Sequence, residues 1–360
     1  MLSFIKEKQS VWETLQHTQK PIVLYGMGNG ADKILDWCDE NMVQVQGVFA
    51  SDEFVRGQQF RGFTVERYAA LQERLGKELL VVIAFASELP EVLARFAQLN
   101  DEQQVVAPHL SLFGEEETVS LEWLAKYEKQ LQQVYDNLAD EQSRRVFAAT
   151  LNYKLSGKIG YLLECETKRE EDLRQLFTWG EDEVYLDLGA YNGDTVEEFG
   201  RLTSYQWKNV IAVEPDRRNC RKLRALGEQL AERGLSIQVE EAGIWSEPGV
   251  LSFSDSGGRQ STFVGASKRE VPVTTIDTLA GEQAVTYIKL DVEGAEVQAL
   301  AGGRSLIGQQ RPKIFVAAYH YDVDLFRLPL LLWEIAPDYK IYLRKHAYVP
   351  AWELNYIAGM

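Results

Sequence analysis

Cysteine, histidine and long apolar runs are all scarce in this sequence. Of its 360 residues, 4 are histidine and 3 are cysteine. The cysteines, Cys38, Cys165 and Cys220, are odd in number and widely spaced, which excludes a disulfide framework or zinc knuckle and favours a reducing cytoplasm. The longest apolar run, from Leu79 to Ala86, is far shorter than a membrane span, which needs about 20 residues. We therefore expect a cytoplasmic protein without a membrane-spanning segment.

Positive charge is also scarce. The sequence has 38 lysine and arginine residues and 54 aspartate and glutamate residues, which gives a net charge of −16. Such a field repels phosphate backbones and anionic lipid, so we expect no nucleic-acid partner. Lys6, Glu7 and Lys8 lie near the start of the chain, and no apolar signal-peptide core follows them. The remaining composition, 45% apolar and 26% charged, is that of an ordinary globular protein.

Alternating strand and helix patterns predict an α/β fold with parallel sheets in two parts of the chain. Residues 1–114 are predicted to form a small Rossmann-like domain, and residues 181–360 a larger α/β domain. Residues 115–180 predict a helical connector of two or three helices without a strand. In the first part we expect strands over 22–25, 43–49 and 79–85, and helices over 3–17, 32–42 and 88–99. In the last part we expect strands over 183–188, 209–214, 236–242, 285–291, 314–318, 339–343 and 354–358, and helices over 194–202, 216–233, 295–300 and 323–336.

A glycine-framed turn after the first strand of the last part is the strongest motif. The strand carries Asp187, and Gly189 and Gly193 follow in the turn that opens the next helix. Glycine permits a sharp turn and the close approach of a ligand, and the open amides of a helix start favour an anionic group. Glu214 follows Gly193 by 21 residues at the end of the next predicted strand, where a carboxylate can accept both hydroxyl protons of a ribose.

Two details of this turn favour S-adenosylmethionine over a dinucleotide. The glycines are spaced Gly-x-x-x-Gly rather than Gly-x-Gly-x-x-Gly. Asp187 at the strand tip would repel a pyrophosphate but suits a cation such as the ammonium of a methionine moiety. A glycine turn that binds no ligand is the alternative.

A second acidic turn follows the strand predicted over 285–291. That strand ends in Asp291, and Glu293 and Gly294 lead into a helix. Because parallel strands share one carboxyl edge, where ligands bind, we expect this turn along the same edge as the glycine-framed one.

Both turns, with Val213-Glu214-Pro215, Gly243-Ile244-Trp245-Ser246 and Arg311-Pro312, resemble the FkbM-family methyltransferases in order and spacing. The resemblance covers about residues 180–358 and implies a class I methyltransferase domain that uses S-adenosyl-L-methionine. It also implies O-methylation of a hydroxyl on a sugar, glycan precursor or related small molecule. The cofactor-binding residues that it implies are Asp187, Gly189, Tyr191 and Gly193 for the methionine end, Glu214 for the ribose, Gly243 and Ile244 near the adenine, and Asp291 at the methyl-transfer edge.

A hydroxyl acceptor gains from a positioned base, and the candidates are His320, Asp291 and Glu293. His320 follows a predicted strand at the carboxyl edge, and an unperturbed imidazole titrates near pH 6.5. A purely structural hydrogen-bonding role is the alternative for His320. The same three side chains suit Mg²⁺ or Mn²⁺, but nothing in their spacing demands a metal, so none is expected.

One of two alternative functions, the first named below, rests on a second glycine turn near the N-terminus. Gly26, Gly28 and Ala31 match the Gly-x-Gly-x-x-Gly/Ala fingerprint, and Asp52 lies 21 residues beyond Ala31. One alternative is a nicotinamide-dependent sugar oxidoreductase, and the other is a non-catalytic nucleotide-binding scaffold. For this turn itself we favour a role in domain packing. A homo-oligomer also stays open.

The polar segment 254–262 lies between predicted strands. It suits either a substrate-facing loop, with Arg259 toward an anionic sugar, or a solvated surface loop.

Overall fold

The computed structural model describes residues 2–113, 117–253 and 269–360. Segment 254–262 with Arg259 therefore lies outside the described residues. The chain divides into two compact units: unit 1 is Met1–Gln132, Arg144–Glu166 and Lys345–Glu353, and unit 2 is Gln133–Ser143, Thr167–Arg344 and Leu354–Met360. Both units thus take part of the helical segment between the two α/β regions. The boundaries at 114 and 180 stay predictions.

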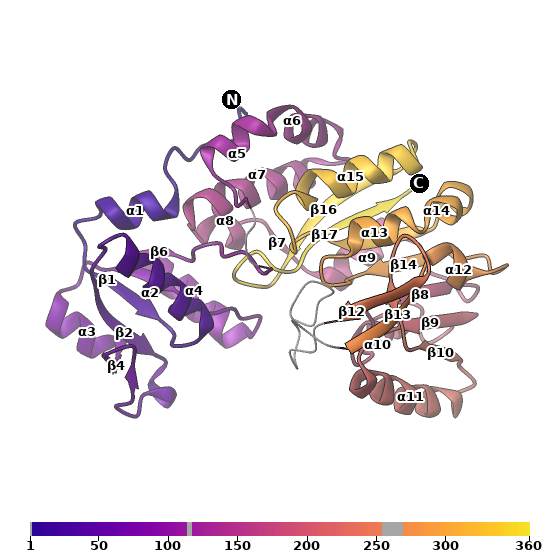
Figure 1. Cartoon of the computed structure of the whole chain (residues 1–360), viewed down its shortest axis with the longest axis horizontal. Coiled ribbons are helices and arrows are strands. Elements are labelled where there is room, and N and C mark those ends of the chain that lie inside the picture. The colour runs from indigo at the N-terminus through magenta and orange to yellow at the C-terminus, as the bar shows by residue number, and fades with distance from the viewer. Residues whose placement is uncertain (1, 114–116, 254–268) are drawn as a thin grey trace. The chain divides into compact units, whose positions relative to one another are not determined.

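Unit 1 is built on a six-stranded sheet in the order β3-β4-β2-β1-β5-β6 (Figure 1). All neighbouring pairs are parallel except β3 with β4. The strands are β1 (Ile22–Tyr25), β2 (Val45–Ala50), β3 (Gln59–Phe60), β4 (Phe63–Arg67), β5 (Leu80–Ile83) and β6 (Gln104–Val106), with helices α1 (Val11–His17), α2 (Asn29–Glu40), α3 (Tyr68–Leu75) and α4 (Pro90–Glu102). The parallel sheet expected here is present, and its classification as a Rossmann-like domain stays a prediction.

Two helices of unit 1 begin later than their apolar spacing predicted. Helix α1 begins at Val11 rather than Ser3, because Ser10 and Glu13 form a capping box in which each side chain accepts the other's backbone N–H. Helix α4 begins at Pro90, whose fixed φ and missing N–H suit the first helical position. Strand β4 and helix α3 were not expected.

The middle of the chain contains more helices than expected, and a short strand. They are α5 (Leu121–Lys126), α6 (Glu128–Asn137), α7 (Glu141–Ser156), α8 (Gly160–Leu163), β7 (Glu166–Thr167) and α9 (Arg169–Leu176). The prediction of two or three helices without a strand was therefore wrong. Within the described ranges, no helix is long and apolar enough to cross a membrane.

Unit 2 contains most of an eight-stranded sheet in the order β10-β9-β8-β14-β15-β17-β16-β7. Strands β10, β9, β8, β14 and β15 are parallel, and β17 is antiparallel to β15. The strands are β8 (Val184–Leu188), β9 (Asn209–Val213), β10 (Ile237–Glu240), β14 (Tyr287–Leu290), β15 (Lys313–Ala317), β16 (Lys340–His346) and β17 (Leu354–Gly359). A separate three-stranded sheet, in the order β11-β13-β12, is formed by β11 (Gly243–Ile244), β12 (Gly249–Phe253) and β13 (Arg269–Thr274).

One face of this large sheet is covered by an aromatic core. Tyr185, Tyr287 and Phe315 project from neighbouring strands β8, β14 and β15, and Phe199 packs onto them from a helix. The helices of unit 2 are α9, α10 (Asp194–Leu202), α11 (Arg217–Ala231), α12 (Ile276–Ala280), α13 (Glu296–Ala301), α14 (Arg304–Gln310) and α15 (Asp324–Ile335). Helices α12 and α14 were not expected, and α15 contains Pro329 in its interior. Unit 2 thus has the α/β architecture with a parallel sheet that the sequence predicts.

Candidate active site

The predicted site residues lie on the carboxyl edge of the sheet in unit 2. Strand β14 is parallel to both β8 and β15, so the turns that follow all three strands leave the sheet at the same edge. The backbone N–H of Asp291 donates to the carbonyl of Leu188, at 3.0 Å, and so joins the two predicted turns directly. The spatial arrangement of Gly189, Glu214, Asp291 and His320 follows from this parallel order.

Gly189 and Gly193 are required by packing as well as by backbone conformation. Gly189 has φ +79°, and a Cβ there would lie 1.8 Å from the carbonyl oxygen of Asp291. Gly193 has φ +94° at the N-cap of α10, and a Cβ there would lie 2.5 Å from Leu226. Tyr191, between them, also adopts a positive φ of 44°. The sequence argument assigned these glycines to ligand approach, whereas neighbouring chain already excludes a side chain at both.

Glu214 ties this turn to the end of β9. Its carboxylate accepts the N–H of Tyr191 at 2.9 Å on one oxygen and the N–H of Asp216 at 2.8 Å on the other. The residue is buried, and burial raises the pKa of Glu214 to about 7, although both N–H donors oppose the shift. Each carboxylate oxygen retains acceptor capacity for a hydroxyl group.

Asp187 has no exposed surface, and its charge is balanced within the protein. The Thr195 hydroxyl donates to Oδ2 at 2.5 Å, while Nζ of Lys289 lies 3.5 Å from Oδ1, which accepts no hydrogen bond. The Lys289 ammonium also donates to the carbonyl of Gly189 at 2.7 Å. Burial raises the pKa of Asp187, against the lowering effects of Lys289 and Thr195. Asp187 therefore contacts the turn from inside the protein and exposes no oxygen to a ligand, and its role in cofactor binding stays a prediction.

Asp291, Glu293 and His320, the three predicted catalytic residues, lie together. Nε2 of His320 is 3.6 Å from Oδ1 of Asp291 and 3.5 Å from Oε2 of Glu293. The His320 side chain is 1% exposed, whereas those of Asp291 and Glu293 are 31% and 32% exposed. Glu293 has φ +54°, a backbone conformation that costs energy for a residue other than glycine. The two carboxylates therefore reach solvent and the imidazole does not.

The pKa values of this cluster are shifted by burial and by mutual charge. Burial opposes a charged imidazole, but the carboxylates of Glu296, Glu293 and Asp291 outweigh it and raise the pKa of His320 well above its ordinary value. Burial raises the pKa of Glu293 despite its contact with His320. For Asp291 burial acts in the same direction, but Lys289, His320 and the Tyr319 hydroxyl together lower the pKa. The surrounding carboxylates therefore favour the charged form of the imidazole, and the role of His320 as a base stays a prediction.

Three residues of the cluster were missed by sequence reasoning. Glu296 lies 3.0 Å from Nδ1 of His320, Tyr319 donates its hydroxyl to Asp291 at 3.0 Å, and buried Asp324 begins α15. The sequence does contain Glu296 three residues after Glu293 and Asp324 four residues after His320, so helical spacing was the available signal. Ligand atoms of Asp291, Glu296 and His320 lie within 4.8 Å of one another, a grouping that suits a metal ion.

Gly243 and Ile244, predicted near the adenine, are buried in the short strand β11. This strand pairs with β13, in the three-stranded sheet. The N–H of Glu214 donates to the carbonyl of Glu240 at 3.0 Å, so the chain that leads into β11 starts beside the Glu214 turn.

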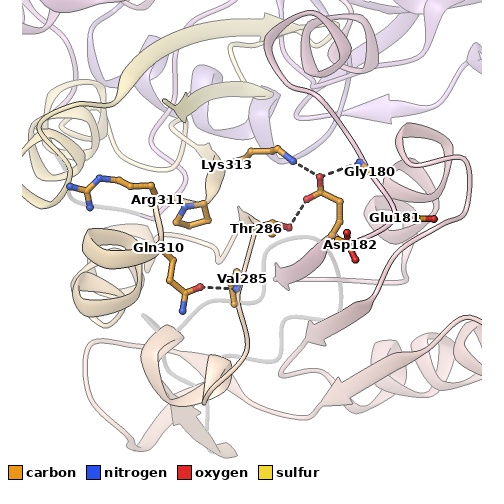
Figure 2. Close-up of a pocket in the computed structure, with 10 residues that line it drawn as sticks. Gly180, Glu181, Asp182, Val285, Thr286, Gln310, Arg311 and Lys313 are labelled. Atoms are coloured by element: carbon orange, nitrogen blue, oxygen red, sulfur yellow. Dashed lines mark hydrogen bonds and ion pairs between the residues drawn. The ribbon is translucent and has the colours of Figure 1, made fainter.

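A pocket of about 500 Å³ lies at the opposite, amino edge of the same sheet (Figure 2). It is lined by residues 180–183, 285–286 and 310–313. At its wall the buried Glu183 carboxylate accepts hydrogen bonds from Thr286 and from the backbone of Gly180, and it pairs with Lys313. These contacts balance the charge of Glu183 internally, which indicates a structural role in anchoring the starts of β8, β14 and β15.

The N-terminal glycine turn is partly filled by its own unit. A Cβ on Gly26 would lie 2.6 Å from the Phe85 ring, and a Cβ on Gly30 would lie 2.4 Å from the carbonyl oxygen of Ala84. Gly28 faces open space, and Asp52 is exposed beyond β2. Close packing thus explains two of these glycines, and ligand binding by this turn stays a prediction.

Comparison with known proteins identifies the C-terminal half. The methyltransferase FkbM domain model matches residues 187–349. The crystal structure of a methyltransferase FkbM from Methylobacillus flagellatus KT is similar over 99% of this chain and 94% of its own, with 20% identity and a TM-score of 0.75, which shows a common fold.

Similarity to two other solved structures is more limited. A precorrin-6y C5,15-methyltransferase from Geobacter metallireducens GS-15 is similar over 53% of this chain and 86% of its own, with 12% identity and a TM-score of 0.34. SMU.1697c from Streptococcus mutans, solved in complex with SAH, is similar over 53% of this chain and 95% of its own, with 13% identity and a TM-score of 0.34. No curated protein matches the sequence. On the match to the family model, residues 187–349 of this chain form a methyltransferase FkbM domain.

Proposed function

We propose that unit 2 binds S-adenosyl-L-methionine and transfers its methyl group to a hydroxyl of a sugar, glycan precursor or related small molecule. The observation that carries this proposal is the convergence, at one sheet edge, of the turn tied to Glu214 and the cluster of Asp291, Glu293 and His320. The Glu214 turn offers oxygen atoms that can accept hydrogen bonds from a ribose. The cluster offers carboxylates that can accept a proton from the hydroxyl group to be methylated.

The residues of the first turn fit the cofactor chemically. Glu214 would accept the ribose hydroxyls, and the Gly189 to Gly193 turn with its open helix start would bind the methionine end. Buried Asp187, paired with Lys289 and bonded to Thr195, would support this turn from inside the protein. When bound, S-adenosylmethionine supplies an electrophilic methyl group on a sulfonium.

The acid–base roles of the second cluster follow from exposure and charge. Glu293 reaches solvent, and its raised pKa makes it the stronger base of the two partly exposed carboxylates. We therefore assign Glu293 the role of the base that accepts the proton from the hydroxyl group of the methyl acceptor. Asp291 is a weaker base and would orient the hydroxyl together with Tyr319. His320 in its charged form would hold the carboxylates of Asp291 and Glu293 in place from the buried side of the cluster. Sugar specificity rests on the family resemblance.

We also place this activity in the cytoplasm. Cys38, Cys165 and Cys220 are all buried, and their odd number and wide spacing fit a reducing compartment.

A calorimetric titration with S-adenosylhomocysteine tests the proposal. One saturable site per chain is expected, and it would justify a screen of sugar hydroxyls as acceptors. A folded, ligand-free protein that gives no heat of binding would overturn the methyltransferase assignment for this chain. A parallel titration with NADH, in wild type and in Gly28→Ala, addresses the oxidoreductase alternative.

A further inference from the structure

Glu296 is a buried carboxylate that connects the two halves of the candidate catalytic cluster. It is the first residue of α13 and is 1% exposed. Its Oε1 accepts the N–H of Val292 at 2.9 Å and lies 3.0 Å from Nδ1 of His320. One oxygen atom therefore contacts both the turn after β14 and the segment after β15.

The contact between Glu296 and Nδ1 determines which nitrogen of His320 faces the partly exposed carboxylates of Asp291 and Glu293. With Nδ1 directed toward Glu296, Nε2 lies 3.6 Å from Asp291 and 3.5 Å from Glu293. Rotation of the ring would exchange Nδ1 with Cδ2 and leave buried Glu296 without an N–H group of the imidazole. Leaving a buried carboxylate uncompensated is costly, so Glu296 selects one ring orientation.

Other charged groups around His320 do not replace Glu296. Asp324 begins α15, which packs on α13, and burial together with the charge of Glu296 raises the pKa of Asp324 well above its ordinary value. Lys289 pairs with Asp187, and the Tyr319 ring lies against the imidazole with its hydroxyl on Asp291. Asp291 and Glu293 face Nε2, so Glu296 supplies the charge on the Nδ1 side.

We propose that Glu296 is a positioning residue for methyl transfer, which fixes the His320 imidazole so that Nε2 holds Asp291 and Glu293 at the acceptor side. This inference rests on the proposed function, because Glu296 acts only through His320 and contacts no substrate itself. Carboxylates that orient a histidine in this way are a general device, since the bond made by one ring nitrogen determines the role of the other.

Nitrogen-15 NMR of selectively labelled histidine tests the proposal without any acceptor or cofactor. The chain has only 4 histidines, and His320→Gln identifies the His320 signals by their loss. In wild type we expect a charged imidazole that persists at least one pH unit above the ordinary midpoint. In Glu296→Gln the midpoint should fall by at least one unit, a tenfold change in the acid constant. The control Glu334→Gln, which removes an exposed carboxylate paired with Arg304, should leave the midpoint unchanged.

Several outcomes would overturn the proposal. One is a His320 midpoint that is the same in wild type and Glu296→Gln. Another is selective broadening of the His320 signals by one equivalent of Mn²⁺ in wild type but not in Glu296→Gln, because Glu296 would then be a metal ligand. If Glu296→Gln does not fold, the wild-type nitrogen-15 shifts still decide, since a His320 whose Nδ1 carries no proton contradicts the contact of that atom with the Glu296 carboxylate.

Turnover measurements then separate positioning from cofactor binding. With an acceptor in hand, Glu296→Gln should lower kcat at least tenfold and shift the pH profile, while S-adenosylhomocysteine affinity stays within twofold. Unchanged kcat would overturn the role of Glu296 even if the NMR result stands. Failure of S-adenosylhomocysteine to bind wild type would instead overturn the proposed function, so the two failures are distinguishable.

Discussion

The backbone amide of Tyr191 donates a 2.9 Å hydrogen bond to the carboxylate of Glu214, across 23 residues of sequence. This bond joins the glycine-framed turn after β8 to the end of β9. It makes Glu214 both a predicted ligand of the ribose and a structural support for the turn that would bind the methionine end. Substitutions at Glu214 therefore affect the whole cofactor site.

Glu214→Gln should weaken S-adenosylhomocysteine binding at least tenfold. The amide can accept only one of the two backbone N–H bonds from Tyr191 and Asp216, and its NH₂ group faces the other donor, at a cost of about 1–3 kcal/mol. Calorimetry of wild type and variant measures the change. Glu228→Gln, an exposed carboxylate on α11, serves as the control. Equal affinity in all three proteins would remove Glu214 from the cofactor site.

The affinity for S-adenosylhomocysteine should depend on pH through Glu214. Its pKa is raised to about 7, so the carboxylate that accepts ribose hydroxyls is lost below that pH. We expect wild-type affinity to fall up to tenfold per pH unit between pH 7 and 5.5, and Glu214→Gln to show a flatter profile. Parallel slopes in the two proteins would contradict this assignment.

The same raised pKa predicts an opposite trend for stability. The folded protein binds the Glu214 proton more tightly than the unfolded chain does, so this group stabilises the fold most below pH about 4.5. That contribution is lost as the pH rises to about 7. Urea unfolding at several pH values should show this slope in wild type and its reduction in Glu214→Gln. An identical pH slope in both would show that Glu214 is not the group responsible.

Gly189→Ala should destabilise unit 2 more than an alanine at another left-handed glycine. A Cβ at Gly189 would lie 1.8 Å from the Asp291 carbonyl, whereas Gly234 has φ +78° and nothing near its Cβ position. Gly234→Ala should cost about 1–2 kcal/mol for conformation alone. Gly189→Ala adds overpacking of about 1–3 kcal/mol. Chemical denaturation measures both, and equal losses would contradict the close approach of β8 and β14.

Lys289→Met should destabilise the protein by about 3–5 kcal/mol, because it leaves Asp187 buried without its cation. The double variant Asp187→Asn with Lys289→Met should recover much of that loss. Lys313→Met is the matched control, since Lys313 pairs with buried Glu183 at the opposite edge of the sheet. Both lysine variants should lower the melting temperature, but only Lys289→Met should also weaken S-adenosylhomocysteine binding. A similar effect of Lys313→Met on binding would contradict the location of the site.

Much of the site was predictable because its motifs are local. A strand, a glycine turn and a helix are encoded within a dozen residues around Gly189, and again around Gly294. Parallel strands necessarily present such turns at one edge, so the proximity of the two turns follows from the fold class alone. The helix starts at Val11 and Pro90 were harder to predict, because capping competes with apolar spacing.

The sequence by itself determined the α/β class of unit 2, the order of its motifs and the acidic character of its carboxyl edge. Only the tertiary structure decided that His320 lies between Glu296 on one ring nitrogen and Asp291 with Glu293 on the other. The physical reason is that a side chain's charge state depends on burial and on neighbours within a few ångströms. Those neighbours lie in the turn after β14 and at the start of α13, and no spacing along the chain specifies how they pack against His320.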